Sequence, residues 1–395
     1  MGDFLIFFYL TTAFVWLYRS HRAFEALREN PVVEVKAADS PLRAHGPIGP
    51  EADRPDRTPL VSILLPVKNE EVNLELCLNQ LLAQDYPSKE IIVINDHSID
   101  RTGEILSQYA LLYPNQIRTF EAADTPPGWT GKNWALAQGV PLARGEWFLF
   151  TDADTRHEPW SLSSAVAHAE GKDLNLLTLA PRCLTDSFWE KTLQPPAMTF
   201  LGLWFPFHKV NQPGSQIHFG NGQYLLMRKK AYQALGGHER VKEAFLEDFS
   251  LVREAKKAGF RIECAIGTKI YGTRMYRSFL GIWLGWRRIF FHAFERKPLT
   301  LLKKAILVFS FSFLPFFFFP FFTRLALIDP DRYGAFWGAS FPILILILLT
   351  AWKAHDVVKA ERRHAFLHPF AGFVLAGILI DAAWAAWQKK ELRWR

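Results

Sequence analysis

The sequence predicts an α/β domain between membrane-spanning segments, and three observations support this fold class. Apolar segments of the kind buried in parallel sheets alternate with segments of helical periodicity between residues 60 and 150. Clusters of polar residues directly follow these apolar segments. The hydrophobic residues, 49% of 395 with 34 Phe and 14 Trp, concentrate towards the two ends of the chain.

Charge and cysteine content narrow the class of protein. A formal net charge of +7 fits a protein that lies on an anionic membrane surface and handles a nucleotide phosphate. We expect no nucleic-acid partner, because the chain has no basic repeat, zinc-ligand spacing or recognition-helix pattern. The widely spaced Cys77, Cys183 and Cys264 predict neither a disulfide framework nor a metal site, and they fit a reducing compartment.

The N-terminal residues 1–22 are predicted to form an uncleaved membrane anchor. Residues 4–17 are apolar, and Arg19, His21 and Arg22 follow them. This order is the reverse of that in a cleaved signal peptide, and it places the following chain in the cytoplasm. The helix must extend into Tyr18 to span a bilayer. Residues 23–59 are rich in Pro, Ala, Gly and charge without periodicity, which is typical of a linker.

The next part of the chain predicts four strands, at residues 60–67, 90–95, 116–120 and 147–150. Helical patterns at 72–83, from 102 towards Tyr109, and at 135–143 lie between them. This alternation predicts right-handed α/β units. Ligands of such sheets bind at the carboxyl ends of the strands, so we expect the polar clusters there to form one site.

Asp152 and Asp154 end the fourth strand and are candidate metal ligands. On extended backbone, residues two apart point to the same side. Two carboxylates that close repel each other unless a cation lies between them, and hard oxygen ligands suit Mg²⁺ or Mn²⁺ with a phosphate-bearing substrate. The alternative is a strand-end turn in which Asp is simply a turn former.

Lys132 follows Gly131 at the start of a predicted helix. Such a segment can hold a diphosphate with backbone amides and an ammonium group. It lacks the spacing of a Walker loop. A glycine turn followed by a solvated lysine is the alternative interpretation.

Five short motifs together resemble glycosyltransferase family 2 over residues 60–291. They are Pro66-Val-Lys-Asn-Glu70, Ile94-Asn-Asp-His-Ser98, Gly131-Lys-Asn133, Thr151-Asp-Ala-Asp154 and Glu247-Asp248. The resemblance implies the GT-A fold, a Rossmann-like mixed sheet, and transfer of a sugar from a nucleotide diphosphate. The segment from Pro126 to Lys132 and the flanking spans are most similar to membrane-bound members found with hopanoid and carotenoid genes.

The resemblance also implies a role for each matching residue. The base and ribose of the nucleotide, with uridine preferred, would be held by Pro66, Lys68, Asn69, Glu70 and Asp96. Lys132 would approach the donor, and Asp152 and Asp154 would hold the divalent metal on the diphosphate. Asp248, beside Glu247, would be the catalytic base. The acceptor would meet the strand at 219–227 through Gly220, Asn221, Gly222 and Gln223, whose small residues allow close approach.

Physical chemistry agrees with the role of Asp248. An inverting transfer needs a base for the acceptor proton, and the charge of the leaving diphosphate needs stabilisation. Asp248 opens a predicted helix over 248–258, closed by Gly259, where a carboxylate is stabilised as the anion. The alternative for Glu247 and Asp248 is helix capping alone.

Two further segments each leave two interpretations open. Arg287 and Arg288 could contact the diphosphate, or they could be the polar face of an interfacial helix within an amphipathic segment at 278–300. No Gln precedes them, and Ile289 or Phe290 stands where the Gln-x-x-Arg-Trp motif of processive synthases has Trp. This departure favours single-sugar transfer. The aromatic residues between 186 and 213 predict either a core-packing insertion or a lipid-facing surface.

Three apolar segments, at 305–323, 336–352 and 367–387, predict a C-terminal membrane domain over 301–395. Lys303 and Lys304 before the first, and the basic loop at 353–368, indicate cytoplasmic flanks. The basic C-terminus would then lie outside, so either the rule is broken locally or one segment is re-entrant. Asp381, within the last segment, is expected near the interface.

We therefore expect a multi-pass cell-membrane protein whose catalytic domain, residues 60–277, faces the cytoplasm. The predicted activity is metal-dependent, inverting transfer of one sugar to a hydroxyl or carboxyl group of a membrane lipid or other amphiphile. A processive polysaccharide synthase and a non-catalytic nucleotide-sugar-binding membrane protein are the alternatives. Intact Asp152, Asp154 and Asp248 count against the second alternative.

Overall fold

The computed structural model describes residues 7, 10–18, 20–21, 30–35 and 58–392. The chain divides into two compact units. The sheet unit comprises residues 30–182 and 205–275, and the helical unit comprises 1–29, 183–204 and 276–395. The sheet unit thus contains most of the predicted catalytic domain at 60–277, but residues 183–204 within that range belong to the helical unit.

The sheet unit is built on a seven-stranded mixed sheet. Its strand order is β3-β2-β1-β4-β8-β6-β9. β1 to β4 are parallel, β8 is antiparallel to β4 and β6, and β6 and β9 are parallel. The bounds are β1 Val61–Val67, β2 Lys89–Asn95, β3 Ile117–Glu121, β4 Trp147–Phe150, β6 Leu176–Ala180, β8 Leu225–Arg228 and β9 Ile262–Ile266. This architecture confirms the predicted α/β class.

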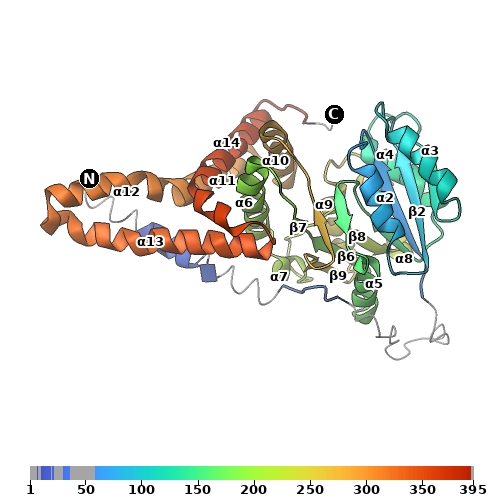
Figure 1. Cartoon of the computed structure of the whole chain (residues 1–395), viewed down its shortest axis with the longest axis horizontal. Helices are drawn as coiled ribbons and strands as arrows, with labels where there is room; N and C mark the ends of the chain where they lie inside the picture. The colour runs from blue at the N-terminus through green and yellow to red at the C-terminus, as the bar shows by residue number, and fades with distance from the viewer. Residues whose placement is uncertain (1–6, 8–9, 19, 22–29, 36–57, 393–395) are drawn as a thin grey trace. The chain divides into compact units, whose positions relative to one another are not determined.

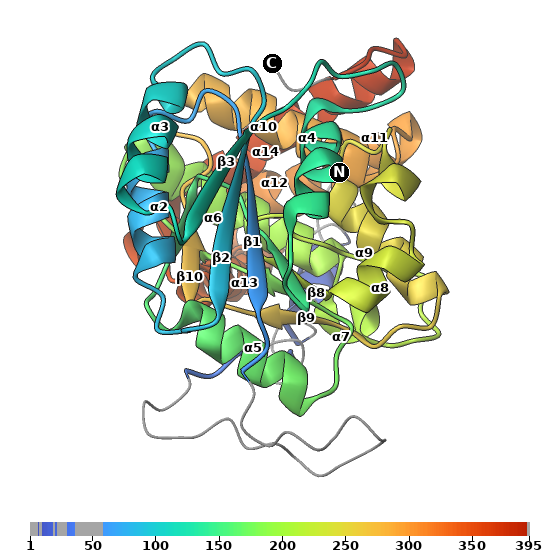
Figure 2. The ribbon, with the colours of Figure 1, turned by 90° about the vertical axis from the view of Figure 1, so that its right-hand side faces the viewer.

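Helices cover both faces of this sheet. Figure 2 shows α2 (Leu74–Leu82) and α3 (Thr102–Leu112) on one side of β1 and β2, and α4 (Gly131–Gly139) on the other. One core contains side chains of α2, α3 and α5 (Ser161–Gly171), and a second contains side chains of α4 and α9 (Glu247–Lys257). The strands between two cores are buried throughout, which explains why they lack polar alternation.

The remaining elements of the sheet unit are short. A second sheet has the order β5-β10-β7, with β5 Thr155–His157, β10 Tyr271–Thr273 and β7 Arg182–Cys183. The short helices are α7 Phe207–Val210 and α8 Lys229–Ala234, and a 3₁₀ turn covers Gly237–Val241. Within the predicted linker, Val32 forms a parallel bridge with Ile266 at the edge of β9. Residues 23–29 and 36–57 of that linker lie outside the described residues.

The predicted strand at 219–227 differs from the observed one. Only Leu225–Arg228 is a strand, and the segment before it, including Gly220, Asn221 and Gly222, has no strand structure. The reason lies in the backbone contacts: Asn221 N donates to the side-chain Oγ1 of Thr178 at 2.9 Å rather than to a backbone carbonyl of a neighbouring strand. The glycine-rich segment is therefore a loop that leads into β8.

Helices make up most of the described part of the helical unit. They are α6 Phe188–Trp204, α10 Phe279–Ala293, α11 Pro298–Val308, a π-helical turn Phe309–Phe313, α12 Leu314–Ile328, α13 Pro330–Val357, a 3₁₀ turn Arg362–Leu367 and α14 His368–Trp387. Figure 1 shows α12 and α13 side by side as a long hairpin. Leu193, Ala197 and Phe200 of α6 join the core formed by α10, α11 and α14.

That packing bears on the aromatic stretch at 186–213. Phe200 is buried in the helical core, and Trp189 and Trp204 pack against it. Phe207 is buried in the sheet unit, and Phe188 alone among the named aromatic residues is largely exposed. Core packing, one of the two interpretations, accounts for most of this stretch.

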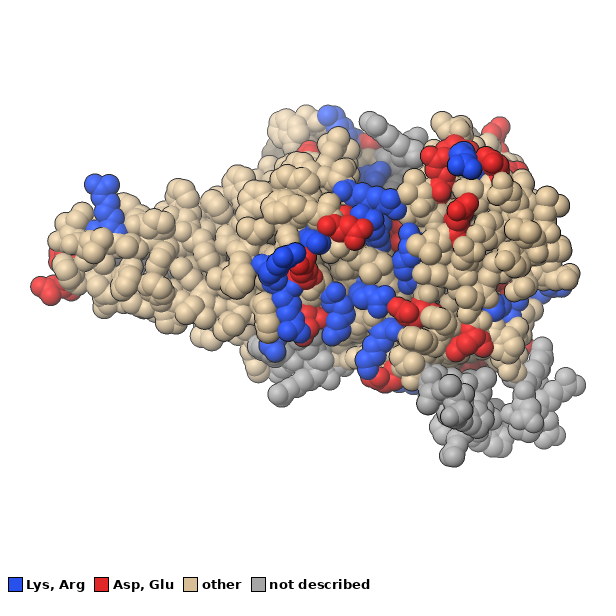
Figure 3. Space-filling view, viewed as in Figure 1, with Lys and Arg blue, Asp and Glu red and all other residues tan. Residues whose placement is uncertain are grey.

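Three helices are long and apolar enough to span a membrane, among the described residues: Pro298–Ile328, Pro330–Val357 and Arg362–Trp387. They cover the three predicted C-terminal spans. On the face seen in Figure 3, charged side chains are sparse along the α12–α13 hairpin. Of the predicted N-terminal anchor, the structure describes residues 7, 10–18, 20 and 21, all of them helical, and the span itself stays a prediction.

Asp381 on α14 has charged and polar partners within the helical unit. Its carboxylate accepts hydrogen bonds from Arg287 Nη1 on α10 at 3.1 and 3.2 Å and from Trp283 Nε1 at 2.8 Å. Its side chain is 32% exposed, so it is neither fully buried nor unpaired. The ion pair offsets the cost of a carboxylate within an apolar helix.

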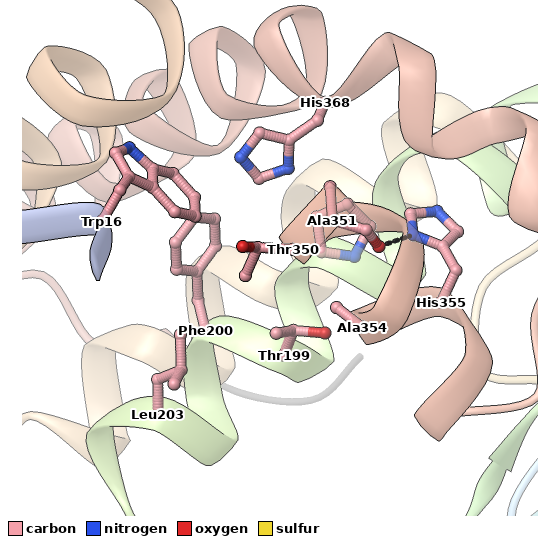
Figure 4. A pocket seen from close by; sticks show the side chains of 10 residues that line it. Trp16, Thr199, Phe200, Leu203, Thr350, Ala351, Ala354, His355 and His368 are labelled. Atoms are coloured by element: carbon pink, nitrogen blue, oxygen red, sulfur yellow. Dashed lines mark hydrogen bonds between the residues drawn. The ribbon is translucent and has the colours of Figure 1, made fainter. Parts of the chain in front are cut away.

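The helical unit also contains a cavity of about 30 Å³, shown in Figure 4. Trp16, Phe200, Leu203, Thr350, His355 and His368 line it. His355 Nδ1 donates to the carbonyl of Ala351 at 2.9 Å. A cavity of this size holds one or two waters but no sugar or acyl chain, so we assign it no substrate.

Candidate active site

The polar clusters predicted at the carboxyl edge of the sheet do meet there. Asn69 N, after β1, donates to Ser98 Oγ, after β2, at 3.0 Å, and Ile99 N donates back to Asn69 Oδ1 at 2.9 Å. Glu70 N donates to Thr102 Oγ1 at 2.8 Å. Asn69 adopts φ +56°, a left-handed conformation that Asn tolerates better than most residues. The loops after β1 and β2 are therefore locked together.

Asp96 is the buried acid of this first cluster. Lys68 Nζ lies 3.2 Å from its Oδ2, and His97 Nδ1 lies 3.2 Å from its Oδ1. A Cβ at Gly131 would lie 2.7 Å from Asp96 Oδ2, so only glycine lets the start of α4 approach this carboxylate. Pro66, the remaining residue that was predicted to contact the nucleotide, lies in β1. The structure brings these residues together at one edge; their contact with a nucleotide stays a prediction.

Asp154 lies among other acids. Its pKa is raised to about 7 by burial, then by the charges of Asp152 and Glu70, although Lys132 and Arg156 oppose that rise. Gln223 Nε2 lies 3.4 Å from each oxygen of Asp154 and donates to Thr273 Oγ1 at 2.8 Å. The site therefore concentrates negative charge at the end of β4.

Lys132 connects the metal-ligand candidates to the acids of α9. Its Nζ lies 2.8 Å from Asp152 Oδ1 and 2.8 Å from Glu247 Oε1. Burial lowers the pKa of Lys132, but these two carboxylates outweigh burial and hold it well above its ordinary value. The side chain is an ammonium group, and the interpretation as a solvated lysine is wrong because both partners are ionic.

Asp248 opens α9 and is held by backbone amides. Gly222 N donates to its Oδ2 at 2.6 Å, and Phe249 N donates to its Oδ1 at 2.8 Å. Burial and then the neighbouring Glu247 raise its pKa to about 7, while Lys132 and the two amides oppose this. A carboxylate with a pKa near neutrality is suited to accept a proton at physiological pH.

The loop predicted to meet the acceptor has mixed roles. Gly220 lies so close to α9 that a Cβ there would be 2.3 Å from the carbonyl oxygen of Asp248. Asn221 Nδ2 donates to Leu179 O at 2.8 Å and to the Tyr271 hydroxyl at 3.0 Å, which are structural contacts. Gly222 and Gln223 instead contact Asp248 and Asp154. Their contact with an acceptor stays a prediction.

Arg287 and Arg288 lie on α10 in the helical unit. The guanidinium of Arg287 pairs with Asp381. Each arginine's predicted contact with the diphosphate stays a prediction.

Some polar neighbours of the site were not singled out from the sequence. Arg156 Nη2 donates to Asn73 Oδ1 at 3.2 Å, and its charge lowers the pKa of Asp154. Asn95 Nδ2 donates to both oxygens of Glu121, and Thr273 supports Gln223. Asn95 stands within the motif Ile94-Asn-Asp-His-Ser98 but was given no role, and Arg156 stands two residues after Asp154. Glu121 and Thr273 have no sequence signal, because their positions depend on strand pairing.

The residues present fit a divalent metal that also binds a substrate phosphate. Within the described part of the chain, no group of three or more His, Cys, Asp or Glu side chains is arranged to hold a metal ion. Asp152 and Asp154 offer hard oxygen donors, and burial and then the charge of Asp152 raise the pKa of Asp154. Mg²⁺ commonly binds through one or two carboxylates together with substrate phosphates.

Comparison with known proteins gives three findings. Residues 62–236 match the family model for glycosyl transferase family 2. The chain is 28% identical over 210 residues to the β-monoglucosyldiacylglycerol synthase of Nostoc sp., an alignment that covers 52% of this chain and 43% of that protein. It is 26% identical over 233 residues to the 4,4'-diaponeurosporenoate glycosyltransferase of Staphylococcus aureus, covering 58% of this chain and 60% of that protein.

A solved structure supports the fold of the whole chain. The mannosyltransferase PcManGT from Pyrobaculum calidifontis, in complex with GDP-Man and Mn²⁺, aligns with a TM-score of 0.50 at 16% identity, covering 99% of this chain and 100% of that one. This similarity confirms the predicted GT-A fold. Four of the five motifs and most strands of the large sheet lie within or at the edge of residues 62–236, the part of the chain that matches glycosyl transferase family 2.

Proposed function

We propose that this chain is an inverting glycosyltransferase that moves a single sugar from a nucleotide-diphosphate sugar to a hydroxyl or carboxyl group of a membrane lipid or amphiphile. The observation that carries the proposal is the environment of Asp248. Two backbone amides orient its carboxylate, its pKa is about 7, and Lys132 links the adjacent Glu247 to Asp152.

Asp248 and Glu247 are suited to different tasks. Glu247 has the Lys132 ammonium as a partner at 2.8 Å, so its charge is balanced. The carboxylate of Asp248 instead accepts hydrogen bonds from two neutral backbone amides, and it retains its basic character. Asp248 takes the proton of the acceptor hydroxyl as the acceptor oxygen attacks the sugar carbon and the bond to the diphosphate breaks.

The leaving diphosphate needs positive charge. Lys132, at the start of α4, supplies an ammonium group on the donor side of the site. Asp152 and Asp154 would hold a divalent cation, Mg²⁺ or Mn²⁺, which when bound stabilises the charge of the diphosphate. The Mn²⁺ and GDP-Man bound to the mannosyltransferase are in keeping with such a site.

A lipid acceptor is supported by two lines of argument. The three candidate spans would hold the chain at a membrane. The relatives from Nostoc sp. and Staphylococcus aureus are named for a glucosyldiacylglycerol and for diaponeurosporenoate. We propose a cell-membrane location with the sheet unit in the cytoplasm, where nucleotide sugars such as UDP-sugars are available.

The test compares membranes that contain the wild type, Asp248→Asn or a control, Asp173→Asn. Each is supplied with a panel of radiolabelled nucleotide sugars and Mg²⁺ or Mn²⁺. We expect label in the organic extract with the wild type and control, and a loss of about 10²–10⁴-fold with Asp248→Asn. Asp173 is an exposed acid in the sheet unit, and Asn accepts its positive φ.

Two outcomes would contradict the proposal. Label in insoluble polymer would favour a processive synthase. Full transfer by Asp248→Asn would exclude Asp248 as the base. Nucleotide binding by Asp248→Asn, measured separately, shows whether the variant still folds.

A further inference from the structure

Lys132 joins carboxylates that the proposed function assigns to different tasks. Its Nζ lies 2.8 Å from Oδ1 of Asp152, a proposed metal ligand, and 2.8 Å from Oε1 of Glu247, the neighbour of the proposed base. The ammonium is therefore already at a carboxylate where the metal would bind. Two cations at one carboxylate repel each other.

The position of Lys132 is fixed by its own helix. Thr130 Oγ1 accepts from Asn133 N at 3.3 Å and caps α4. Asn133 Nδ2 donates to the carbonyls of Val241 and Ala244, each at 2.9 Å, which ties α4 to the turn before α9. Lys132 thus reaches Asp152 from an anchored backbone.

Gly222 leaves the space in which the ammonium lies. A Cβ at Gly222 would be 3.2 Å from Lys132 Nζ and 3.1 Å from Glu247 Oε1. Any larger residue would crowd the ion pair. The loop before β8 therefore accommodates this arrangement of Lys132 and Glu247.

The negative charges near Asp152 favour a cation at this position, with or without a bound nucleotide. The charges of Asp152 and Glu70 act on Asp154, and those of Asp152 and Glu247 act on Lys132. Lys132 balances part of this charge. A nucleotide diphosphate would add negative charge of its own and would offer the ammonium a second partner.

Resting on the proposed function, we propose that Lys132 is a positioning cation that holds Asp152 until the donor binds, and then pairs with the diphosphate. Metal and nucleotide consequently bind with positive coupling: the metal binds weakly alone and tightly with the nucleotide. Because such coupling is reciprocal, the metal strengthens nucleotide binding by the same factor.

The test measures Mn²⁺ binding to the full-length protein in detergent, from the electron paramagnetic resonance signal of unbound Mn²⁺. The wild type, Lys132→Gln and Lys68→Gln are compared without nucleotide, and the first two again with UDP and with GDP. Lys68→Gln also removes one positive charge at this edge, but Lys68 pairs with Asp96 and not with Asp152.

We expect Lys132→Gln to bind Mn²⁺ without nucleotide about tenfold tighter than the wild type, and Lys68→Gln to change little. The gain in Mn²⁺ affinity on adding nucleotide should be large for the wild type and small for Lys132→Gln. Equal nucleotide-free affinities and equal gains for these two proteins would overturn the inference while leaving the metal site in place.

A second variant protects the test against misfolding of Lys132→Gln. Glu247→Gln removes one of the two carboxylates that pair with Lys132 and leaves Asp152 as the other. Lys132 should then hold Asp152 more firmly, so the affinity for Mn²⁺ without nucleotide should fall. An unchanged or tighter affinity would count against the inference. Absence of Mn²⁺ binding by the wild type even with nucleotide would overturn the metal site of the proposed function, and this inference with it.

Discussion

Asp248 and Glu247 are neighbours in sequence, but they have different surroundings. Glu247 is buried against the Lys132 ammonium, whereas Asp248 is held by amides of Gly222 and Phe249. Glu247 is a cause of the raised pKa of Asp248, after burial. Glu247 therefore adjusts the pH at which Asp248, the proposed base, is ionised.

This relation predicts the pH dependence of activity. The base must be ionised, so transfer should fall as pH drops below about 7. Glu247→Gln removes a like charge, which lowers the pKa of Asp248 and moves the acid limb of kcat/KM to lower pH. Glu243→Gln, an exposed acid in the preceding turn, should leave the limb in place. An acid limb unmoved by Glu247→Gln would refute this account.

The residue scale also shows which contacts a sequence can reveal. The motif residues Asn69, Asp96, Asp152 and Asp248 could be predicted because each stands at the end of a strand or the start of a helix. The partners of Lys132 could not, because Glu247 is far along the chain and meets Lys132 only through the turn that Asn133 anchors. The same holds for Thr273 beneath Gln223.

Among the elements, α9 and the loop before β8 are the closest packed at the site. Gly220 lies against the backbone of Asp248: an added Cβ would be 2.3 Å from its carbonyl oxygen and 2.5 Å from its carbonyl carbon. Any shift of the Asp248 backbone, in the first turn of α9, also moves the Asp248 carboxylate. The position of Asp248, the proposed base, thus depends on a glycine that has no reactive side chain.

Gly220→Ala should therefore impair both stability and activity. We expect a loss of about 1–3 kcal/mol in the free energy of unfolding, because the core is overpacked there. Transfer should fall by about 10²-fold, because Asp248 is displaced. Gly171→Ala is the matched control, since nothing lies within 4 Å of an added Cβ at the end of α5, and its stability should change by no more than about 1 kcal/mol. Thermal unfolding and initial rates measure both.

The bounds of the strands show where the hydrophobic pattern of the sequence predicted the structure correctly and where it did not. The strand at Trp147–Phe150 matches the prediction because four buried apolar residues end at Thr151 and Asp152. The strand predicted at 219–227 is mostly loop, because Gly220 and Gly222 serve close approach to α9 rather than a ladder. Amino-acid composition alone does not distinguish a glycine that allows close approach to a neighbouring helix from a glycine within a strand.

At the scale of the whole molecule, the three candidate spans predict how the protein can be extracted from membranes. Each is a helix of 26 to 31 residues with few charges. We expect the chain to stay in the membrane fraction after washing with high salt or alkaline carbonate, and to leave it only in detergent. Release by carbonate would show a peripheral protein. An added soluble marker protein, which should be released, is the control.

The length of the first of these helices has a consequence for its depth in a bilayer. Pro298–Ile328 has 31 residues and is about 46 Å long, whereas the hydrocarbon layer is about 30 Å thick. The stretch between Lys304 and Arg324 carries no charge and is about 28 Å long, a close match to that thickness. Lys304 also lies over the rings of Trp204 and Phe294, as cations and aromatic rings do among lipid headgroups.

If this helix spans a bilayer, we expect these two cations to lie at the boundaries of the hydrocarbon layer. The turns before Lys304 and after Arg324 would lie among headgroups or be accommodated by tilt. A thicker bilayer would draw Lys304 towards the acyl chains at a modest cost for each ångström of mismatch. The protein should consequently favour membranes of ordinary thickness, and its activity should decline in vesicles of very long-chain lipids.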